Sequence, residues 1–358
     1  MVGVSELSKI LEIVENTKHY DGMTLIERMD ECRVSGISIA LIENFEIIDT
    51  FVHGVKNRET KEKVTVDTLF QAASISKPVF AVAMMRLVEQ GVFELEADIS
   101  EYLVDYEVPT FDGKKHKITL KQLLSHHAGL NLHGFAGYQQ HQEIPTVAQI
   151  LAGESPSNHL KLKLIKEPDT EFKYSGGGYA LAQKMMTDVC KLDFCELMED
   201  LVLSPFVMKQ STYLQPLPKE RIGEIAFGYD AHNLQIPGGF DIMPELSAAG
   251  LWSTPTDLAC FGIEMMRAFN GESSFLKEDT AQLMMEKVAE KSPYGIGFSV
   301  NQRETGLTFG HGGSNDGFKA NMCFSPTDGS GLVVMHNSEI GWFLVNEVTE
   351  AFKEAYGW

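Results

Sequence analysis

Strand-like sequence stands at both ends of this chain, with helix-like sequence between. Residues 36–54 (GISIALIENFEIIDTFVHG) form two β-rich runs around the polar pair Glu43-Asn44, which predicts a hairpin. Strand patterns return near the C-terminus, where turn residues separate them. We therefore expect an α+β fold: one antiparallel sheet built from both ends and flanked by the terminal helices, with a large helical insertion. The C-terminal strands are predicted at 294–300, 306–310, 318–326 and 331–337.

The middle of the chain, from about residue 76 to 290, has apolar residues at helical spacing. One helix is predicted to begin near Ser76 and to close at Gly91. Thr119 is a candidate N-cap of a second helix, with Gly129 as its stop. A last helix is expected over 342–356. An N-terminal amphipathic helix would place four apolar residues on one face: Leu7, Ile10, Leu11 and Val14.

Charge and cysteine content restrict the partners and the compartment. Lys and Arg total 30 against 50 Asp and Glu, a net charge of −20 that repels phosphate backbones and anionic lipid. We therefore expect neither a nucleic acid nor a membrane partner. The N-terminal residues lack the features of a signal peptide, and no later run reaches the length of a membrane span. Five cysteines without a CxxC pair favour a reducing compartment, and a cytoplasmic location is expected.

The stretch LFQAASISKPVF puts Ser74 three positions before Lys77, where an apolar helix begins. Positions i and i+3 share a helix face, so the hydroxyl and the amine can meet. Partial burial would lower the pKa of the lysine toward the range of a general base. The alternative is that Ser74 only caps the helix. A second Ser-x-x-Lys, Ser274 to Lys277, lies in a polar connection, and Ser274 is interpreted as a surface or capping residue.

Two further stretches favour a nucleophile with its base. FKYSGGGYALAQKMM places Tyr174 before three glycines and a helix, and LTFGHGGSNDGFKA places His311 at the end of a β-run. An acyl-transfer site needs a nucleophile, a base and backbone donors for the oxyanion, and these segments could supply them. Tyr174 could instead be a packing aromatic, and His311 a structural hydrogen-bonding residue.

The ordered motifs SISK, YSG and HGG resemble the signature of serine penicillin-recognising hydrolases, which is SxxK, Tyr-x-Asn and then Lys-Thr-Gly or His-x-Gly. The phrases TLFQAASISK, ITLKQLLSHHAGL and SAAGLWSTPTDLACFG are similar to the class C β-lactamase-like branch, which includes esterases and D-aminopeptidases. The resemblance runs from about residue 34 to 337. It implies the β-lactamase/transpeptidase-like form of the expected fold.

By this resemblance, Ser74 is the acylated nucleophile, Lys77 its proton acceptor and Tyr174 the acid/base that serves the leaving group. The backbone N–H groups of Ser74 and Ser314 would form the oxyanion hole. Four positions are implied to contact substrate: His311, Gly312, Gly313 and Gly176.

Two departures from the family pattern bear on the substrate. Gly176 stands where the family's Asn hydrogen-bonds an acylamide, and His311 replaces a lysine with a group expected to titrate near neutral pH. Both changes weaken recognition of an amide side chain plus a carboxylate. They argue against an efficient β-lactamase.

Other sequence patterns do not indicate a further functional site. The histidines His126, His127, His133 and His141 match neither HExxH nor a zinc-finger spacing, so no metal is expected. The methionine doublets are interpreted as core. An α/β-hydrolase is disfavoured, since no GxSxG elbow exists.

We therefore expect a serine hydrolase that acts through a covalent acyl-enzyme on a small ester or peptide-like amide, with a small-molecule substrate and no cofactor. The alternatives are a β-lactamase or D,D-carboxypeptidase, and a non-catalytic binding protein of the same fold. Residues 1–75 with 290–358 would form the sheet domain and 76–289 the helical domain, with the active site in the cleft between them. The sequence assigns no oligomeric state.

Overall fold

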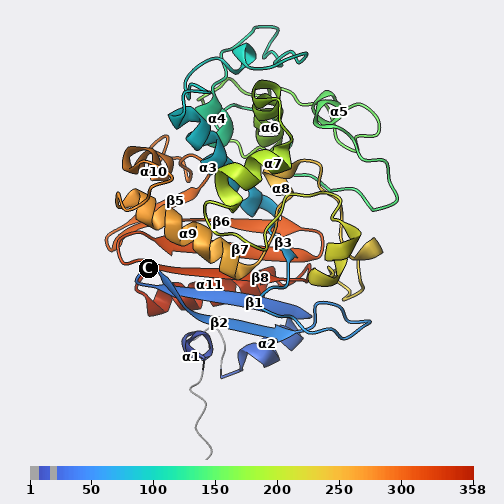
Figure 1. The fold of residues 1–358 in the computed structure, drawn as a ribbon, viewed down its shortest axis with the longest axis vertical. Coiled ribbons are helices and arrows are strands. Elements are labelled where there is room, and N and C mark those ends of the chain that lie inside the picture. The colour runs from blue at the N-terminus through green and yellow to red at the C-terminus, as the bar shows by residue number, and fades with distance from the viewer. Residues whose placement is uncertain (1–7, 17–21) are drawn as a thin grey trace, which may run out of the picture.

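The computed structural model describes residues 8–16 and 22–358. Its centre is a six-stranded antiparallel sheet in the order β2-β1-β8-β7-β6-β5 (Figure 1). The N-terminal hairpin lies beside the last strand, because β1 pairs with β8 from Ile37↔His336 to Ile42↔Gly331. The α+β sheet predicted from the two ends of the chain is therefore confirmed. Its strands are β1 (Gly36–Glu43), β2 (Glu46–Gly54), β5 (Ser299–Arg303), β6 (Gly306–Asn315), β7 (Phe318–Ser325) and β8 (Ser330–His336).

The terminal helices cover one face of the sheet, as expected. Val14 of α1 and Val348 of α11 belong to a small apolar core that also contains Ile39 and Val334 of the sheet. The expected N-terminal apolar face is present at Ile10 and Val14, with Leu11 half-buried, while Leu7 lies outside the described residues. The helices on this face are α1 (Lys9–Glu15), α2 (Leu25–Glu31) and α11 (Trp342–Ala355).

The opposite face of the sheet carries the larger core. Helix α9 (Pro255–Phe269) packs along β1 and β8, and the remaining helices of the middle segment lie beyond it (Figure 1). The methionine doublets are all buried in this core, as predicted. The other helices are α3 (Ser76–Glu89), α4 (Leu120–Leu124), α5 (Val147–Ala152), α6 (Gly176–Cys190), α7 (Phe194–Met198), α8 (Leu246–Ala249) and α10 (Glu278–Met285).

The strand predicted at 306–310 runs on to Asn315 as β6, and two other predicted boundaries are also wrong. Thr119 does cap α4, accepting from the Gln122 N–H at 3.2 Å, but the helix ends at Leu124 because His126 takes a left-handed φ of 63°. The prediction had placed its stop at Gly129.

The second of these wrong boundaries is the start of the strand predicted at 294–300. It begins only at Ser299, since Gly297 has a φ of 86° and the chain bends through residues 295–298, which brings Tyr294 opposite Ser299. The strand then runs on to Arg303.

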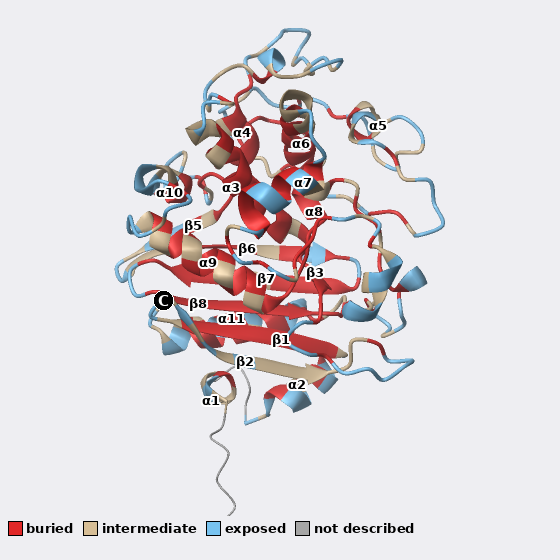
Figure 2. Cartoon of the chain, in the orientation of Figure 1, coloured by how far each residue is buried: buried red, intermediate tan, exposed pale blue. Residues whose placement is uncertain are grey.

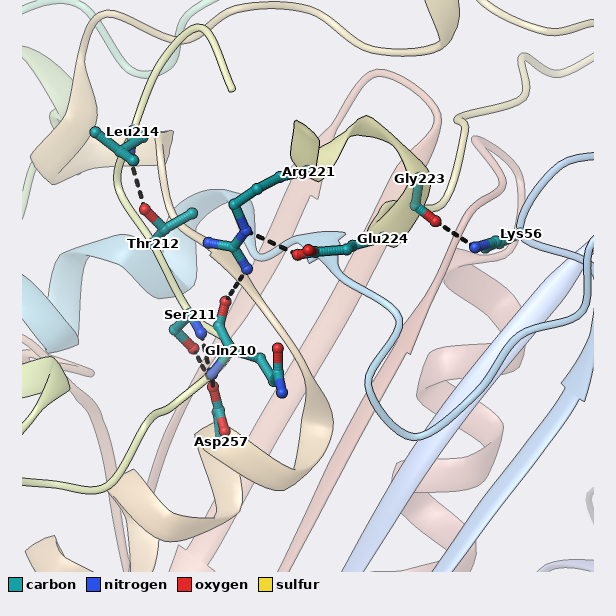
Figure 3. A network of polar contacts seen from close by, with 9 residues as sticks. All are labelled: Lys56, Gln210, Ser211, Thr212, Leu214, Arg221, Gly223, Glu224 and Asp257. Carbon is teal, nitrogen blue, oxygen red and sulfur yellow. Dashed lines mark hydrogen bonds and ion pairs between the residues drawn. The ribbon is translucent and has the colours of Figure 1, made fainter. Parts of the chain in front are cut away.

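A polar network joins the loop after α7 to the start of α9 (Figure 3). The Asp257 carboxylate accepts from the backbone N–H groups of Gln210 and Ser211, each at 2.8 Å. Arg221 donates to the Gln210 carbonyl at 2.7 Å. This loop pairs at Thr212 with Trp252 of β4 (Trp252–Ser253), which itself pairs with β3 (Phe70–Gln71). The network therefore supports the two-stranded sheet that leads into the nucleophile segment.

Burial follows this layering (Figure 2). β1, β7 and β8 are almost wholly buried, whereas the edge strand β2 is only half-buried. Across the described ranges 8–16 and 22–358, every helix is too short or too polar to span a bilayer. All five cysteines are free.

Candidate active site

Ser74 lies in a 3₁₀ turn (Ala73–Ile75) between β3 and α3. The turn begins with Ala73 in a left-handed conformation, φ 50°, a costly geometry for a residue with a side chain. The second serine of the motif holds it: the Ser76 hydroxyl donates to the Ala73 carbonyl at 2.6 Å and accepts from the Leu251 N–H at 2.9 Å. Ser76 therefore supports the turn, and the half-buried Ser74 is left to face the cavity.

Lys77 lies in the first turn of α3 and is 2% exposed. Its Nζ donates to Ser74 Oγ at 3.0 Å and to the Ala248 carbonyl of α8 at 2.7 Å. Burial lowers the pKa of Lys77 to about 7, the direction that the sequence predicts. A large fraction of the amine is therefore uncharged near neutral pH and able to accept the hydroxyl proton.

Tyr174 precedes α6 and lines the same cavity as Ser74 and Lys77. Its ring centroid lies 5.1 Å from Lys77 Nζ. Burial raises the pKa of Tyr174 above its usual value. The phenol thus stays protonated near neutral pH and is able to donate a proton.

His311 on β6 lines the same cavity, and both of its ring nitrogens have partners. Nδ1 lies 2.6 Å from the Gly312 carbonyl and Nε2 lies 3.2 Å from the Tyr294 hydroxyl. The expectation that His311 titrates near neutral pH is wrong. Burial and the nearby charge of Lys77 lower its pKa to about 3, so the ring is neutral.

The glycines after His311 let β6 approach the nucleophile turn. A Cβ on Gly313 would lie 2.2 Å from the Ala72 carbonyl oxygen, and one on Gly312 would lie 3.0 Å from the Trp342 ring. These glycines therefore allow β6 to pack closely against other segments of the protein, at the Ala72 carbonyl and the Trp342 ring. Ser314 follows at the exposed end of the strand and also lines the cavity.

The cavity has a volume of about 460 Å³ and brings together all but one of the predicted site residues. Gly176 is the exception: it is buried in the first turn of α6 and does not reach the lining. Sequence reasoning missed several residues of the wall. They are His133, Gly134, Phe135, Ala248, Ala249, Tyr294, Asn315 and Trp342.

Asn315 and Ala248 illustrate why sequence patterns do not identify such residues. The Asn315 amide donates to Gln71 Oε1 at 2.7 Å, which ties the end of β6 to β3. The sequence signal that could have identified Asn315 is its position one residue after Ser314. Ala248 acts through its backbone carbonyl, for which no side-chain pattern exists.

The paired histidines hold the segment that carries Tyr174. His126 Nδ1 accepts from the Ser175 N–H at 3.1 Å, and His127 Nδ1 lies 2.9 Å from the Ser125 carbonyl. In the part of the chain that the structure describes, no three His, Cys, Asp or Glu side chains form a group that could hold a metal ion. His126 therefore orders the backbone around the second motif, whereas the His127 ring contacts its own turn.

The fold and this arrangement define a class: α+β proteins in which a Ser-x-x-Lys pair at a helix start faces one strand of an antiparallel sheet, here the part of β6 that lies beyond its pairing with β5. A family model described as "Beta-lactamase" matches residues 24–348. The chain belongs to the beta-lactamase family, a family of serine hydrolases, and the predicted resemblance is confirmed.

Relatives within this family differ in length and name. Protein flp of Staphylococcus aureus (strain MW2) is 23% identical over 329 residues, which are 88% of this chain and 62% of that protein. The chain thus matches less than two thirds of that relative. Esterase EstB of Burkholderia gladioli is 31% identical over 118 residues, which cover 31% of this chain and 30% of the esterase.

Solved structures share the fold. The octameric penicillin-binding protein homologue from Pyrococcus abyssi superposes with a TM-score of 0.77 at 23% identity, covering 93% of this chain and 76% of that one. D-amino acid amidase from Ochrobactrum anthropi SV3, complexed with L-phenylalanine amide, gives a TM-score of 0.76 at 21% identity, covering 98% and 100%. These likenesses establish the β-lactamase/transpeptidase-like architecture.

Proposed function

We propose that this protein is a serine hydrolase that acts on a small ester or peptide-like amide through a covalent acyl-enzyme. The observation that carries the proposal is the buried Lys77 amine, 3.0 Å from Ser74 Oγ and with its pKa lowered to about 7. A lysine in this state can take the hydroxyl proton without a separate base.

The chemistry needs two displacements. Ser74 Oγ attacks the substrate carbonyl as its proton passes to Lys77, and the backbone N–H groups of Ser74 and Ser314 would stabilise the oxyanion. The leaving group departs with a proton from Tyr174. The Lys77 ammonium then returns its proton to the Tyr174 phenolate. A water attacks the acyl carbonyl and loses a proton to Lys77, which passes a proton to Ser74 Oγ as the acyl bond breaks. The raised pKa of Tyr174 supports its part as donor, since it keeps the phenol protonated.

Hydrolysis of p-nitrophenyl butyrate tests this proposal. We expect Ser74→Ala to lower kcat/KM by at least about 10³-fold, since the nucleophile is lost. Ser274→Ala is the matched control: this serine also opens a Ser-x-x-Lys sequence, but it is exposed in a polar connection, and its loss is expected to leave turnover unchanged.

Unchanged turnover in Ser74→Ala would refute the assignment. Two probes address the alternatives. A fluorophosphonate that adds mass to the wild type but not to Ser74→Ala would oppose a binding-only protein. Rapid cleavage of nitrocefin would instead support a β-lactamase.

A further inference from the structure

The space above Gly176 is filled by another segment of the chain. A Cβ on Gly176 would lie 2.8 Å from Phe135 Cε2 and 3.2 Å from the His133 carbonyl oxygen. The Gly176 N–H donates to that carbonyl at 3.1 Å. Glycine at the third position of the second motif therefore has a packing reason: any side chain there would collide with residues 133–135.

This segment is fastened to the second motif along its backbone. The Gly177 N–H donates to the Leu132 carbonyl at 3.0 Å, and the Ser175 hydroxyl donates to the Asn131 carbonyl at 2.5 Å. Because these bonds involve the residues next to Tyr174, the position of residues 131–135 is set by the same turn that places the phenol. The segment thus belongs to the wall of the cavity.

The segment brings an imidazole and a phenyl ring into the cavity. The His133 ring centroid lies 4.8 Å from that of Tyr174. His133 borders the cavity but remains exposed. Partial desolvation and the charges of Lys77 and Lys173 lower the pKa of His133, so the ring is neutral near neutral pH and offers one donor and one acceptor nitrogen. Within the described ranges, no protein atom forms a hydrogen bond with either nitrogen. The ring is therefore available to a ligand.

The rest of the lining fits an uncharged ligand. Among residues 8–16 and 22–358, no Asp or Glu borders the cavity, and its one basic side chain besides the neutral histidines is Lys77, which already hydrogen-bonds Ser74. Phe135, Tyr294 and Trp342 add apolar ring surface. A carboxylate or ammonium on the substrate would find no fixed countercharge here.

We propose that residues 133–135 take the place of the missing side chain at Gly176, and that His133 hydrogen-bonds an amide or similar polar group in the acyl part of an uncharged substrate. Phe135 packs against the apolar part of the same group. This inference rests on the proposed function, because it assigns the substrate class of that site.

A matched pair of esters tests the role of His133. The p-nitrophenyl ester of N-acetylglycine carries an amide in its acyl chain, whereas p-nitrophenyl pentanoate has the same chain length without it. We expect His133→Ala to lower kcat/KM about tenfold for the acetylglycine ester, mainly through KM, as for the loss of one hydrogen bond. The pentanoate should change less than about twofold, because it makes no such bond.

Two variants complete the design. His133→Gln keeps a donor and an acceptor and should retain part of the preference for the acetylglycine ester. His141→Ala, an exposed histidine of the same connection, should change neither ester. Circular dichroism checks that each variant folds. Equal losses on both esters, or no loss on either, would overturn the inference.

Binding without turnover separates this inference from the proposed function. In the Ser74→Ala background, calorimetry with N-acetylglycine methyl ester and methyl pentanoate should show a preference for the amide that His133→Ala removes. If the wild type hydrolyses neither p-nitrophenyl ester but this preference is found, the hydrolase proposal fails and the assignment of His133 stands. If the preference is absent, the assignment of His133 fails.

Discussion

At the scale of single residues, Lys77, Tyr174 and His311 differ in their protonation states and therefore in the chemistry that each can perform. Lys77 and His311 are buried and Tyr174 is half-buried in the cavity that Ser74 lines, yet burial affects them differently because it always disfavours the charged form. It lowers the pKa of Lys77 and of His311 and raises that of Tyr174. Near neutral pH only Lys77 is close to its midpoint. It is therefore the one group of the three whose protonation state changes with pH in the neutral range.

The pH dependence of activity follows from this. The base must be uncharged, so we expect kcat/KM for p-nitrophenyl butyrate to rise with pH and to level off above the Lys77 pKa of about 7. Lys77→Arg should lower kcat/KM by about 10²- to 10⁴-fold, since an arginine stays protonated and cannot accept the hydroxyl proton. In His311→Gln, the pH profile of kcat/KM should keep the same inflection, whatever the effect of the substitution on the rate itself. A profile that is flat between pH 6 and 8, or an inflection that disappears in His311→Gln, would contradict the assignment.

At the scale of elements, the contact of α9 with the sheet depends on one small residue. A Cβ on Gly262 would lie 2.1 Å from Cε1 of Phe324, a buried ring on β7. The helix therefore approaches the sheet more closely than any side chain at this position permits.

We expect Gly262→Ala to lower the free energy of unfolding by about 1–3 kcal/mol, the usual cost of overpacking a core. Urea unfolding followed by circular dichroism measures it. Gly223→Ala is the control, because a Cβ there would meet no atom within 4 Å. An equal effect of the two substitutions would show that helix propensity, and not the contact with Phe324, accounts for the change.

At the scale of the whole molecule, one large core joins the sheet to the helical middle. Ala40 of β1, Met185 of α6 and Phe318 of β7 all belong to it. Trp252 lies at the junction, with its ring 5.8 Å from that of Phe318. The division into a sheet domain and a helical domain stays a proposal, and this shared core predicts that the two unfold together.

Fluorescence of Trp252 tests that prediction. In a Trp342→Phe, Trp358→Phe variant it is the remaining tryptophan, so its emission reports the junction while far-UV circular dichroism reports all helices and strands. We expect the two urea midpoints to coincide, as they do for a single cooperative unit. Two separated transitions would show that the domains unfold independently.

The sequence by itself determined the sheet from both ends, the order of the motifs and the pairing of Ser74 with Lys77. Alternation, helical spacing and i to i+3 geometry are local properties that a linear pattern records. It could not determine that His311 is neutral, that residues 133–135 occupy the space above Gly176, or that the Ala248 carbonyl holds Lys77. Those facts depend on burial and on contacts between segments far apart in the chain, and only the tertiary structure sets the distances and the solvent exclusion that produce them.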